Sequence, residues 1–115
     1  MKRNSGNVFK ALGDTNRIRI VKMLEIRPLC VCEVREVLDL STSTVSKHLS
    51  ILRSADLIVD EKDGRWVNYR LNRNATSSLV SSQLALMKAA FADDDQVIAD
   101  KKKLRSVNRV AICGM

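Results

Sequence analysis

The feature that most constrains the fold is a serine-rich segment at residues 41–52, which reads STSTVSKHLSIL. Val45, Leu49 and Leu52 recur at the spacing of one helix face, so the segment is predicted to be an amphipathic helix with one buried stripe. Ser41 is a good N-cap because its hydroxyl can accept a hydrogen bond from a first-turn amide. The opposite face carries short hydroxyl side chains around one lysine. That face suits contact with phosphates and base edges, or simple exposure to solvent.

The segments on either side of this helix favour a helix-turn-helix with a wing. A short helix is expected at residues 33–38, joined to the serine-rich helix by a tight connection at residues 39–41. Asp63-Gly64 separates two runs rich in β-branched and aromatic residues and predicts a β-hairpin. The expected fold is therefore mainly α with a small β-hairpin, a winged helix-turn-helix.

The predicted winged helix defines the candidate DNA-binding residues. Five lie on the polar side of the serine-rich helix and two flank the hairpin tip: Thr42, Ser43, Ser46, Lys47, Ser50, Lys62 and Arg65. The two hairpin cations could reach a phosphate backbone or a minor groove, or they could only keep an exposed turn soluble. Twenty lysines and arginines against 13 acidic residues give a net charge of +7, which favours a polyanionic partner such as nucleic acid.

More helices are expected on both sides of the winged helix. The first two span about residues 8–12 and 14–26, and Pro28 ends the second. Residues 75–92 form a helix whose wide apolar face predicts a homodimer surface, with an intramolecular core helix as the alternative. One more helix is expected from residue 96 to about residue 110. We divide the chain into a winged-helix DNA-binding and dimerisation domain, residues 1–92, and a basic C-terminal extension, residues 93–115, that carries Cys113.

Composition excludes several classes of protein. A chain of 115 residues has room for one domain with a modest core, and an aromatic content of 3% indicates that this core is aliphatic. No apolar run is long enough to span a membrane, and the N-terminus lacks the apolar segment of a signal peptide, so a cytoplasmic location is expected. We do not expect an enzyme, because no histidine accompanies a nucleophile, no glycine loop could cradle a phosphate and no paired carboxylates can be placed.

The cysteines Cys30, Cys32 and Cys113 are odd in number and do not resemble a secreted disulfide framework. Cys30 and Cys32 could face one ion only if the backbone there is extended or forms a distorted first helical turn. The helix N-terminus and nearby Arg35 are expected to lower the thiol pKa, and thiolates suit soft ions such as As(III), Sb(III) and Cd(II). The alternative is that both cysteines are small buried hydrophobic side chains.

Four stretches taken together resemble the ArsR/SmtB family of metal-sensing bacterial repressors. They are LGDTNRIRI at residues 12–20, LCVCE at 29–33, STSTVSKHL at 41–49 and GRWVNYRL at 64–71. The resemblance implies a homodimeric winged-helix repressor that holds double-stranded operator DNA when metal-free and releases it on binding the inducer. The Leu-Cys-Val-Cys sequence is similar to that of arsenic- and cadmium-responsive members, which implies As(III) or Sb(III) as inducer, with Cd(II) and Pb(II) as further candidates.

The chain departs from the arsenic-responsive type at one position. Many such members carry a third cysteine where this chain has Arg35, and trivalent arsenic ordinarily takes three thiolates. Cys113 could supply the third ligand from its own or the partner subunit, or it could be a bystander. The single histidine, His48, does not lie on the C-terminal helix where the family's zinc sensors carry ligands. We therefore expect no zinc site there, and a structural or phosphate-contacting role for His48.

Two alternatives to metal-released repression remain open. A redox-sensing repressor would form a disulfide between Cys113 and either Cys30 or Cys32. A thiol metal carrier that never binds DNA belongs to a different class of protein, and the exposed serines, Lys47 and the hairpin argue against it.

Overall fold

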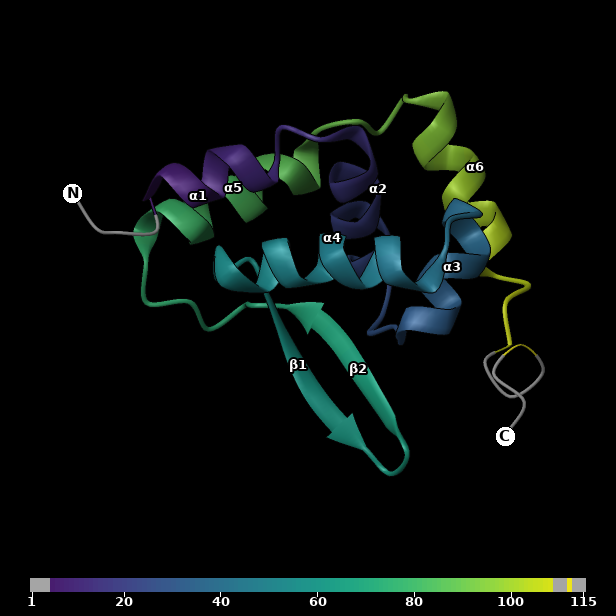
Figure 1. Ribbon diagram of the computed structural model, residues 1–115. Helices are drawn as coiled ribbons and strands as arrows, with labels where there is room; N and C mark the ends of the chain where they lie inside the picture. The colour runs from purple at the N-terminus through teal and green to yellow at the C-terminus, as the bar shows by residue number, and fades with distance from the viewer. Residues whose placement is uncertain (1–4, 109–111, 113–115) are drawn as a thin grey trace.

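The computed structural model describes residues 5–108 and residue 112. Within this part of the chain, helices and one hairpin follow the order α1, α2, α3, α4, β1, β2, α5, α6 (Figure 1). Their bounds are α1 Ser5–Ala11, α2 Thr15–Leu24, α3 Val31–Leu38, α4 Thr42–Ser54, β1 Ile58–Asp63, β2 Trp66–Leu71, α5 Ser78–Ala89 and α6 Asp95–Leu104. The predicted fold class is confirmed. No helix in the described residues is long and apolar enough to cross a bilayer.

Side-chain caps begin the helices that organise the site. Ser41 caps α4 as predicted, and its Oγ accepts a hydrogen bond from the Thr44 amide at 3.2 Å. Asp14 caps α2 and accepts hydrogen bonds from the amides of Asn16 and Arg17. Burial disfavours the charged form of Asp14, but these hydrogen bonds and the positive Arg17 side chain outweigh burial, so the pKa of Asp14 is lowered.

An aliphatic core joins the helices to the base of the hairpin. Its buried side chains come from α1 to α5, from the hairpin base and, through Leu104, from α6. Val45, Leu49 and Leu52 of α4 are completely buried, which confirms the predicted stripe. Each such side chain contributes roughly 1.5–3 kcal/mol when it leaves water. The polar side of α4 therefore has to face outward.

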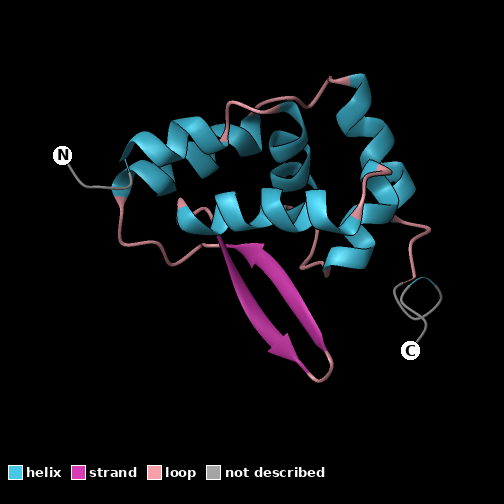
Figure 2. Cartoon of the chain, viewed as in Figure 1, coloured by secondary structure: helices cyan, strands magenta, loops and turns pink. Residues whose placement is uncertain are grey.

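The hairpin projects from the helical body, and only its base is buried (Figure 2). The strand register pairs Asp63 with Trp66, so the two loop residues are Gly64 and Arg65. Gly64 has a φ of +61°, a conformation that glycine adopts without a steric penalty. The predicted hairpin is confirmed, but its turn lies one residue later than Asp63-Gly64 indicates. Arg65 consequently stands in the turn itself.

A short antiparallel bridge joins the segment before α3 to the hairpin. The Leu29 amide donates to the Tyr69 carbonyl at 3.0 Å, and the Tyr69 amide donates to the Leu29 carbonyl at 2.8 Å. Leu29 is completely buried. The residue before Cys30 is thus fixed directly to β2.

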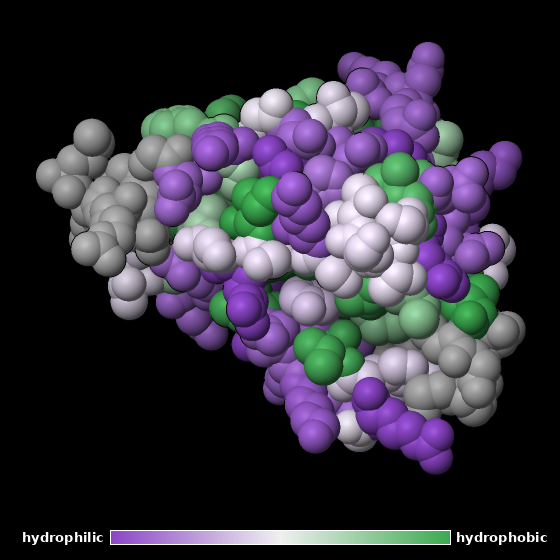
Figure 3. All heavy atoms as spheres, in the orientation of Figure 1, coloured by the Kyte–Doolittle hydropathy of each residue, from purple (hydrophilic) through white to green (hydrophobic). Residues whose placement is uncertain are grey.

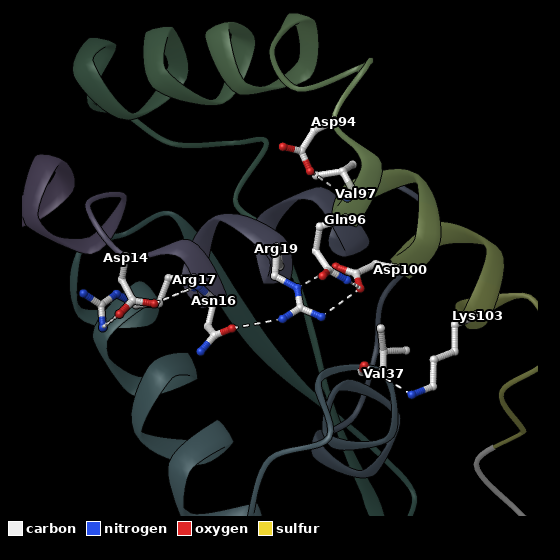
Figure 4. A network of polar contacts seen from close by, with 10 residues as sticks. All are labelled: Asp14, Asn16, Arg17, Arg19, Val37, Asp94, Gln96, Val97, Asp100 and Lys103. Atoms are coloured by element: carbon white, nitrogen blue, oxygen red, sulfur yellow. Dashed lines mark hydrogen bonds and ion pairs between the residues drawn. The ribbon is translucent and has the colours of Figure 1, made fainter.

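The helix near the C-terminus, α6, is shorter than the predicted span of residues 96–110, of which 109 and 110 lie outside the described residues. Asp100 of α6 accepts two hydrogen bonds from Arg19 of α2, Nε to Oδ2 at 2.8 Å and Nη2 to Oδ1 at 2.9 Å (Figure 4). Gln96 donates to the same carboxylate at 2.9 Å. Lys103 reaches the Val37 carbonyl of α3 at 3.4 Å. Together these contacts hold α6 against α2 and α3.

The apolar face of α5 is divided between the core and the surface. Val80 and Met87 are buried in the chain's own core, whereas Leu86 is 61% exposed. Part of this face therefore packs inside the chain, as the alternative prediction of an intramolecular core helix stated. On α1, which lies beside α5 (Figure 1), Phe9 is 59% exposed. The exposed apolar surface of the two helices is what remains for a partner.

Candidate nucleic-acid interface and thiol site

The outer side of α4 carries the five predicted contact residues of the recognition helix. All five are exposed: Thr42, Ser43, Ser46, Lys47 and Ser50. Figure 3, drawn from the same side as Figure 1, shows weakly polar and hydrophilic side chains across the front, where α4 lies. Short side chains around one cation leave this surface without bulky obstruction, which suits entry into a groove.

The hairpin tip carries the other two predicted contact residues, and both are exposed. Lys62 stands between the acidic residues Glu61 and Asp63, so the local charge around it is small. Arg65 occupies the turn, at the end of the hairpin farthest from the core. The geometry therefore favours Arg65 over Lys62 as the phosphate contact.

Arg35 is a residue whose position the sequence did not predict correctly. Its Nη1 donates to the Thr42 Oγ1 at 3.4 Å, which places its charge at the start of α4. Arg35 lies in α3, seven residues before Thr42 at the start of α4, and the short connection between the two helices was the available signal. Arg35 is thus a further cation beside the predicted DNA-contact residues.

The thiol site lies at the start of α3. Cys30 is the N-cap residue, with φ of −90° and ψ of 169°, and Cys32 lies in the first helical turn. This is the extended backbone that the sequence argument requires for two cysteines so spaced to approach one ion. Cys30 is buried and free, whereas Cys32 is half-buried and disulfide-bonded. Cys113 lies outside the described residues.

Glu33 organises the backbone around these cysteines, and both of its carboxylate oxygens accept hydrogen bonds. Its Oε1 accepts a hydrogen bond from the Cys30 amide at 3.0 Å, and its Oε2 accepts one from Arg27 at 2.7 Å. Within residues 5–108 and 112, no three histidine, cysteine or acidic side chains are grouped so that they could hold a metal ion. A complete thiolate site therefore needs a ligand beyond the two cysteines of α3.

The prediction of lowered thiol pKa values is wrong for Cys30. Burial is the largest influence and raises the pKa of Cys30, and the negative charge of Glu33 raises it further. Hydrogen bonds from backbone amides oppose this shift without reversing it. Arg35 does not lower the pKa of Cys30 as predicted, because its side chain is directed to Thr42. The surroundings of Cys30 therefore favour its protonated form.

His48 lies on the inner edge of α4 and has a structural contact. Its Nδ1 is 3.2 Å from Nη1 of Arg17, and Arg17 also donates from Nε to the Ala11 carbonyl at 2.8 Å. His48 is half-buried. The contact links α4 to α2 and to the end of α1, in agreement with a structural role.

The thiol site is packed between the two predicted DNA-contact elements. Val34 and Val37 of α3 lie in the same core as Val45 and Leu49 of α4. On the other side, Leu29 is bonded to the hairpin. A displacement of the first turn of α3 would reach the recognition helix through side-chain packing and the hairpin through the backbone.

Comparison with known proteins places these features in a family. Residues 14–59 match the family described as bacterial regulatory protein, arsR family. The arsenical resistance operon repressor of Escherichia coli (strain K12) is 46% identical over 66 residues, covering 56% of this chain and 56% of that protein. The arsenical resistance operon repressor of Bacillus subtilis (strain 168) is 38% identical over 77 residues, covering 66% of this chain and 73% of that protein.

Similarity to solved structures extends over more of the chain. Reduced HlyU from Vibrio cholerae N16961 superposes with a TM-score of 0.63 at 29% sequence identity, covering 77% of this chain and 90% of that one. By contrast, the chain spans little more than half the length of its Escherichia coli relative. The family match itself spans α2, α3, α4 and the start of β1.

Proposed function

Since this chain belongs to the arsR family of bacterial regulatory proteins, whose members are DNA-binding transcriptional regulators and not enzymes, we propose that it is a repressor released from its operator by a thiophilic metalloid or metal ion. As(III) is the first candidate inducer and Sb(III) the second, with Cd(II) and Pb(II) as further soft ions. Thiol metal transport without DNA binding is disfavoured by the family membership.

One observation carries this proposal. The exposed hydroxyl and lysine side of α4 stands beside a projecting hairpin, and the cysteines lie at the start of the helix packed against α4. The outer side of α4 can enter a major groove while Arg65 meets the adjacent backbone. The inducer site is thus connected to both contact elements.

We expect the repressor to act as a homodimer. Exposed Phe9 and Leu86 on the neighbouring helices α1 and α5 provide an apolar surface that a second copy would cover. Two recognition helices would then meet half-sites about 34 Å apart. Leu86→Glu should yield monomers by sedimentation velocity, whereas Ile98→Glu, at an exposed apolar position on α6, should leave the dimer intact.

Arsenic binding can proceed although Cys30 is protonated. As(OH)₃ exchanges each hydroxide for a thiolate, and the displaced hydroxide leaves as water with the thiol proton. Every exchange forms one As–S bond and breaks one As–O bond and one S–H bond. The reduced protein would supply Cys30 and Cys32, and Cys113 is the proposed third ligand. A small thiol or a retained hydroxide would otherwise complete the site.

Release would follow from the position of the thiols. We expect that drawing the sulfurs of Cys30 and Cys32 onto one ion moves the first turn of α3. That movement would disturb both the Leu29–Tyr69 bridge and the packing against α4. A coupling free energy of about 1.4 kcal/mol already weakens operator affinity about tenfold.

The test is an operator-binding titration of reduced protein, followed by fluorescence anisotropy, with and without As(III). Cys30→Ser and Cys32→Ser should each bind the operator but not release it with As(III). Lys47→Ala should weaken operator binding, whereas Lys102→Ala, which removes the same charge from an exposed position on α6, should not. Normal release by both serine variants would refute the inducer site, and unchanged DNA binding by Lys47→Ala would refute the α4 contact.

The variant Cys113→Ser decides the number of protein ligands. Loss of As(III) affinity in this variant would support Cys113 as the third ligand. Wild-type affinity would mean that a solvent or small-thiol ligand completes the site.

A second candidate mode of release is oxidation, favoured by the disulfide-bonded state of Cys32. Hydrogen peroxide would oxidise two thiols to a disulfide and be reduced to two water molecules. In this mode Cys113 would bond to Cys30 or Cys32. Mass spectrometry after peroxide treatment, compared with As(III) titration under reductant, separates the two modes by which treatment releases the operator.

A further inference from the structure

A cavity of about 570 Å³ opens between the end of α2, the end of β2, α5 and α6. This volume falls within the roughly 300–1,000 Å³ of small-molecule sites. Its lining contains neither Cys30 nor Cys32 and none of the predicted DNA contacts. The cavity is therefore separate from both parts of the proposed repressor site.

Positive charge converges on this cavity from three different elements. Arg73 follows β2, Lys88 lies in the last turn of α5 and Lys101 belongs to α6. In the described part of the chain, the side chains of these three residues have no ion pair or hydrogen bond. Glu25 also lines the hollow, but its carboxylate is paired with Lys22. Three cations without ion-pair partners of their own favour an anionic occupant.

Apolar side chains form the rest of the wall that the argument needs. Ile26, just after α2, lines the cavity and is 48% exposed. Leu71 and Leu84 line it as well. An occupant with an apolar body would cover these groups.

The cavity also has a hydrogen-bond acceptor available. Glu25 lines it and is held by Lys22, whose Nζ lies 2.8 Å from Oε1 and also donates to the Met87 carbonyl at 2.7 Å. The other carboxylate oxygen, Oε2, is buried and has no hydrogen-bond partner among the described residues. A buried acceptor left unpaired is costly, so a rotation of the Glu25 side chain that brings Oε2 to an N–H or O–H donor on an occupant would be favoured.

We propose that this cavity binds a small organic anion with an apolar body and one hydrogen-bond donor. The anionic group pairs with Lys88, Lys101 and Arg73, and the donor binds Glu25. Such a ligand contacts the end of the hairpin through Leu71 and contacts α5 through Lys88. It is a ligand site separate from the thiols.

The test uses calorimetric titration of reduced, DNA-free protein with three related probes. The first is the hydroxynaphthoate isomer with its hydroxyl and carboxylate at opposite ends of the fused rings. Naphthoate lacks the donor and naphthol lacks the negative charge. We expect one hydroxynaphthoate per chain, weaker binding of naphthoate and the weakest binding of naphthol.

Variants locate the site. The double variant Lys88→Ala/Lys101→Ala should weaken hydroxynaphthoate binding about tenfold or more, equivalent to about 1.4 kcal/mol. Lys62→Ala/Lys102→Ala removes the same charge from exposed positions outside the cavity and should leave binding unchanged. Ala85→Phe, at an exposed lining position, should fill part of the cavity and reduce binding without disturbing the core.

Several results would overturn the proposal. They are no binding, several equivalents per chain, equal affinity for naphthol and naphthoate, or an equal loss in both double variants. Competition between probe binding and self-association would instead show that a second copy of the chain covers the cavity. Because the titration uses neither DNA nor arsenic, its outcome is independent of the proposed repressor function.

Discussion

The hairpin and α6 are both appended to the same helical core, but they are held to it differently. Asp100 of α6 and its partner Arg19 have side chains that are only 4% and 16% exposed, and they share two hydrogen bonds. The ion pair between Arg53 of α4 and Asp60 of the hairpin is 37–54% exposed and joined by one hydrogen bond at 3.2 Å. Water screens the second pair far more than the first.

This contrast indicates which element can adjust to a partner. The hairpin has its strand ladder, a buried base and the Leu29–Tyr69 bridge, and its tip projects from the helical body (Figure 2). In α6, Leu104 is buried in the core and Asp100 is buried against α2. Four predictions test this difference, from the largest expected effect to the smallest.

Asp100→Ala should lower the free energy of unfolding by about 4 kcal/mol, because it leaves the largely buried Arg19 guanidinium without its partner. Chemical denaturation measures the loss. A change below about 1 kcal/mol would mean that α6 is held no more firmly than the hairpin.

Leu104→Ala should lower the free energy of unfolding by about 3 kcal/mol, since the leucine is 2% exposed and its removal leaves a cavity. Val67→Ala, at an exposed apolar position on the hairpin, is the control and should cost less than about 1 kcal/mol. Similar losses in the two variants would contradict the comparison.

Arg65→Ala should leave the unfolding free energy unchanged but reduce the salt dependence of operator binding by about one unit in the slope of log K against log salt. The reason is that the proposed contact of this turn residue is with a single phosphate. Binding isotherms at several salt concentrations provide the measurement, with Lys102→Ala as the charge-matched control. An unchanged slope would remove the hairpin tip from the interface.

Asp60→Ala should change the unfolding free energy by about 0.5 kcal/mol or less, because both members of its ion pair are substantially exposed. The same denaturation experiment as for Asp100→Ala gives a direct comparison. If the losses from Asp60→Ala and Asp100→Ala were equal, exposure would not be what separates the two pairs.

Features that depend on neighbouring residues were predictable from the sequence. The Ser41 cap and the Val45, Leu49 and Leu52 stripe follow from positions within one helix, and the structure contains both. The hairpin was predicted from its turn residues, but the observed strand register places the loop at Gly64-Arg65 instead of Asp63-Gly64. Pairing of the whole strands, rather than the turn dipeptide alone, decides that register.

For the candidate site, the sequence identified which residues to consider but not their electrostatic surroundings. The five predicted contact residues of α4 are exposed as expected, because they lie on the side of the helix opposite the buried stripe. The pKa of Cys30 is raised rather than lowered, because burial is a property of the packed core. Arg35 is close to the cysteines in sequence, yet its side chain contacts Thr42.

By itself, the sequence determined the helix caps, the amphipathic faces, the presence of the hairpin and the family, all of which depend on local patterns or their order. Only the tertiary structure decided that Arg19 pairs with Asp100, that Leu29 pairs with Tyr69, and that Lys88, Lys101 and Glu25 surround one cavity. These residues are far apart along the chain, and no periodic pattern connects them. Burial of the shared aliphatic core brings them together, and the polar contacts form where that packing places their side chains.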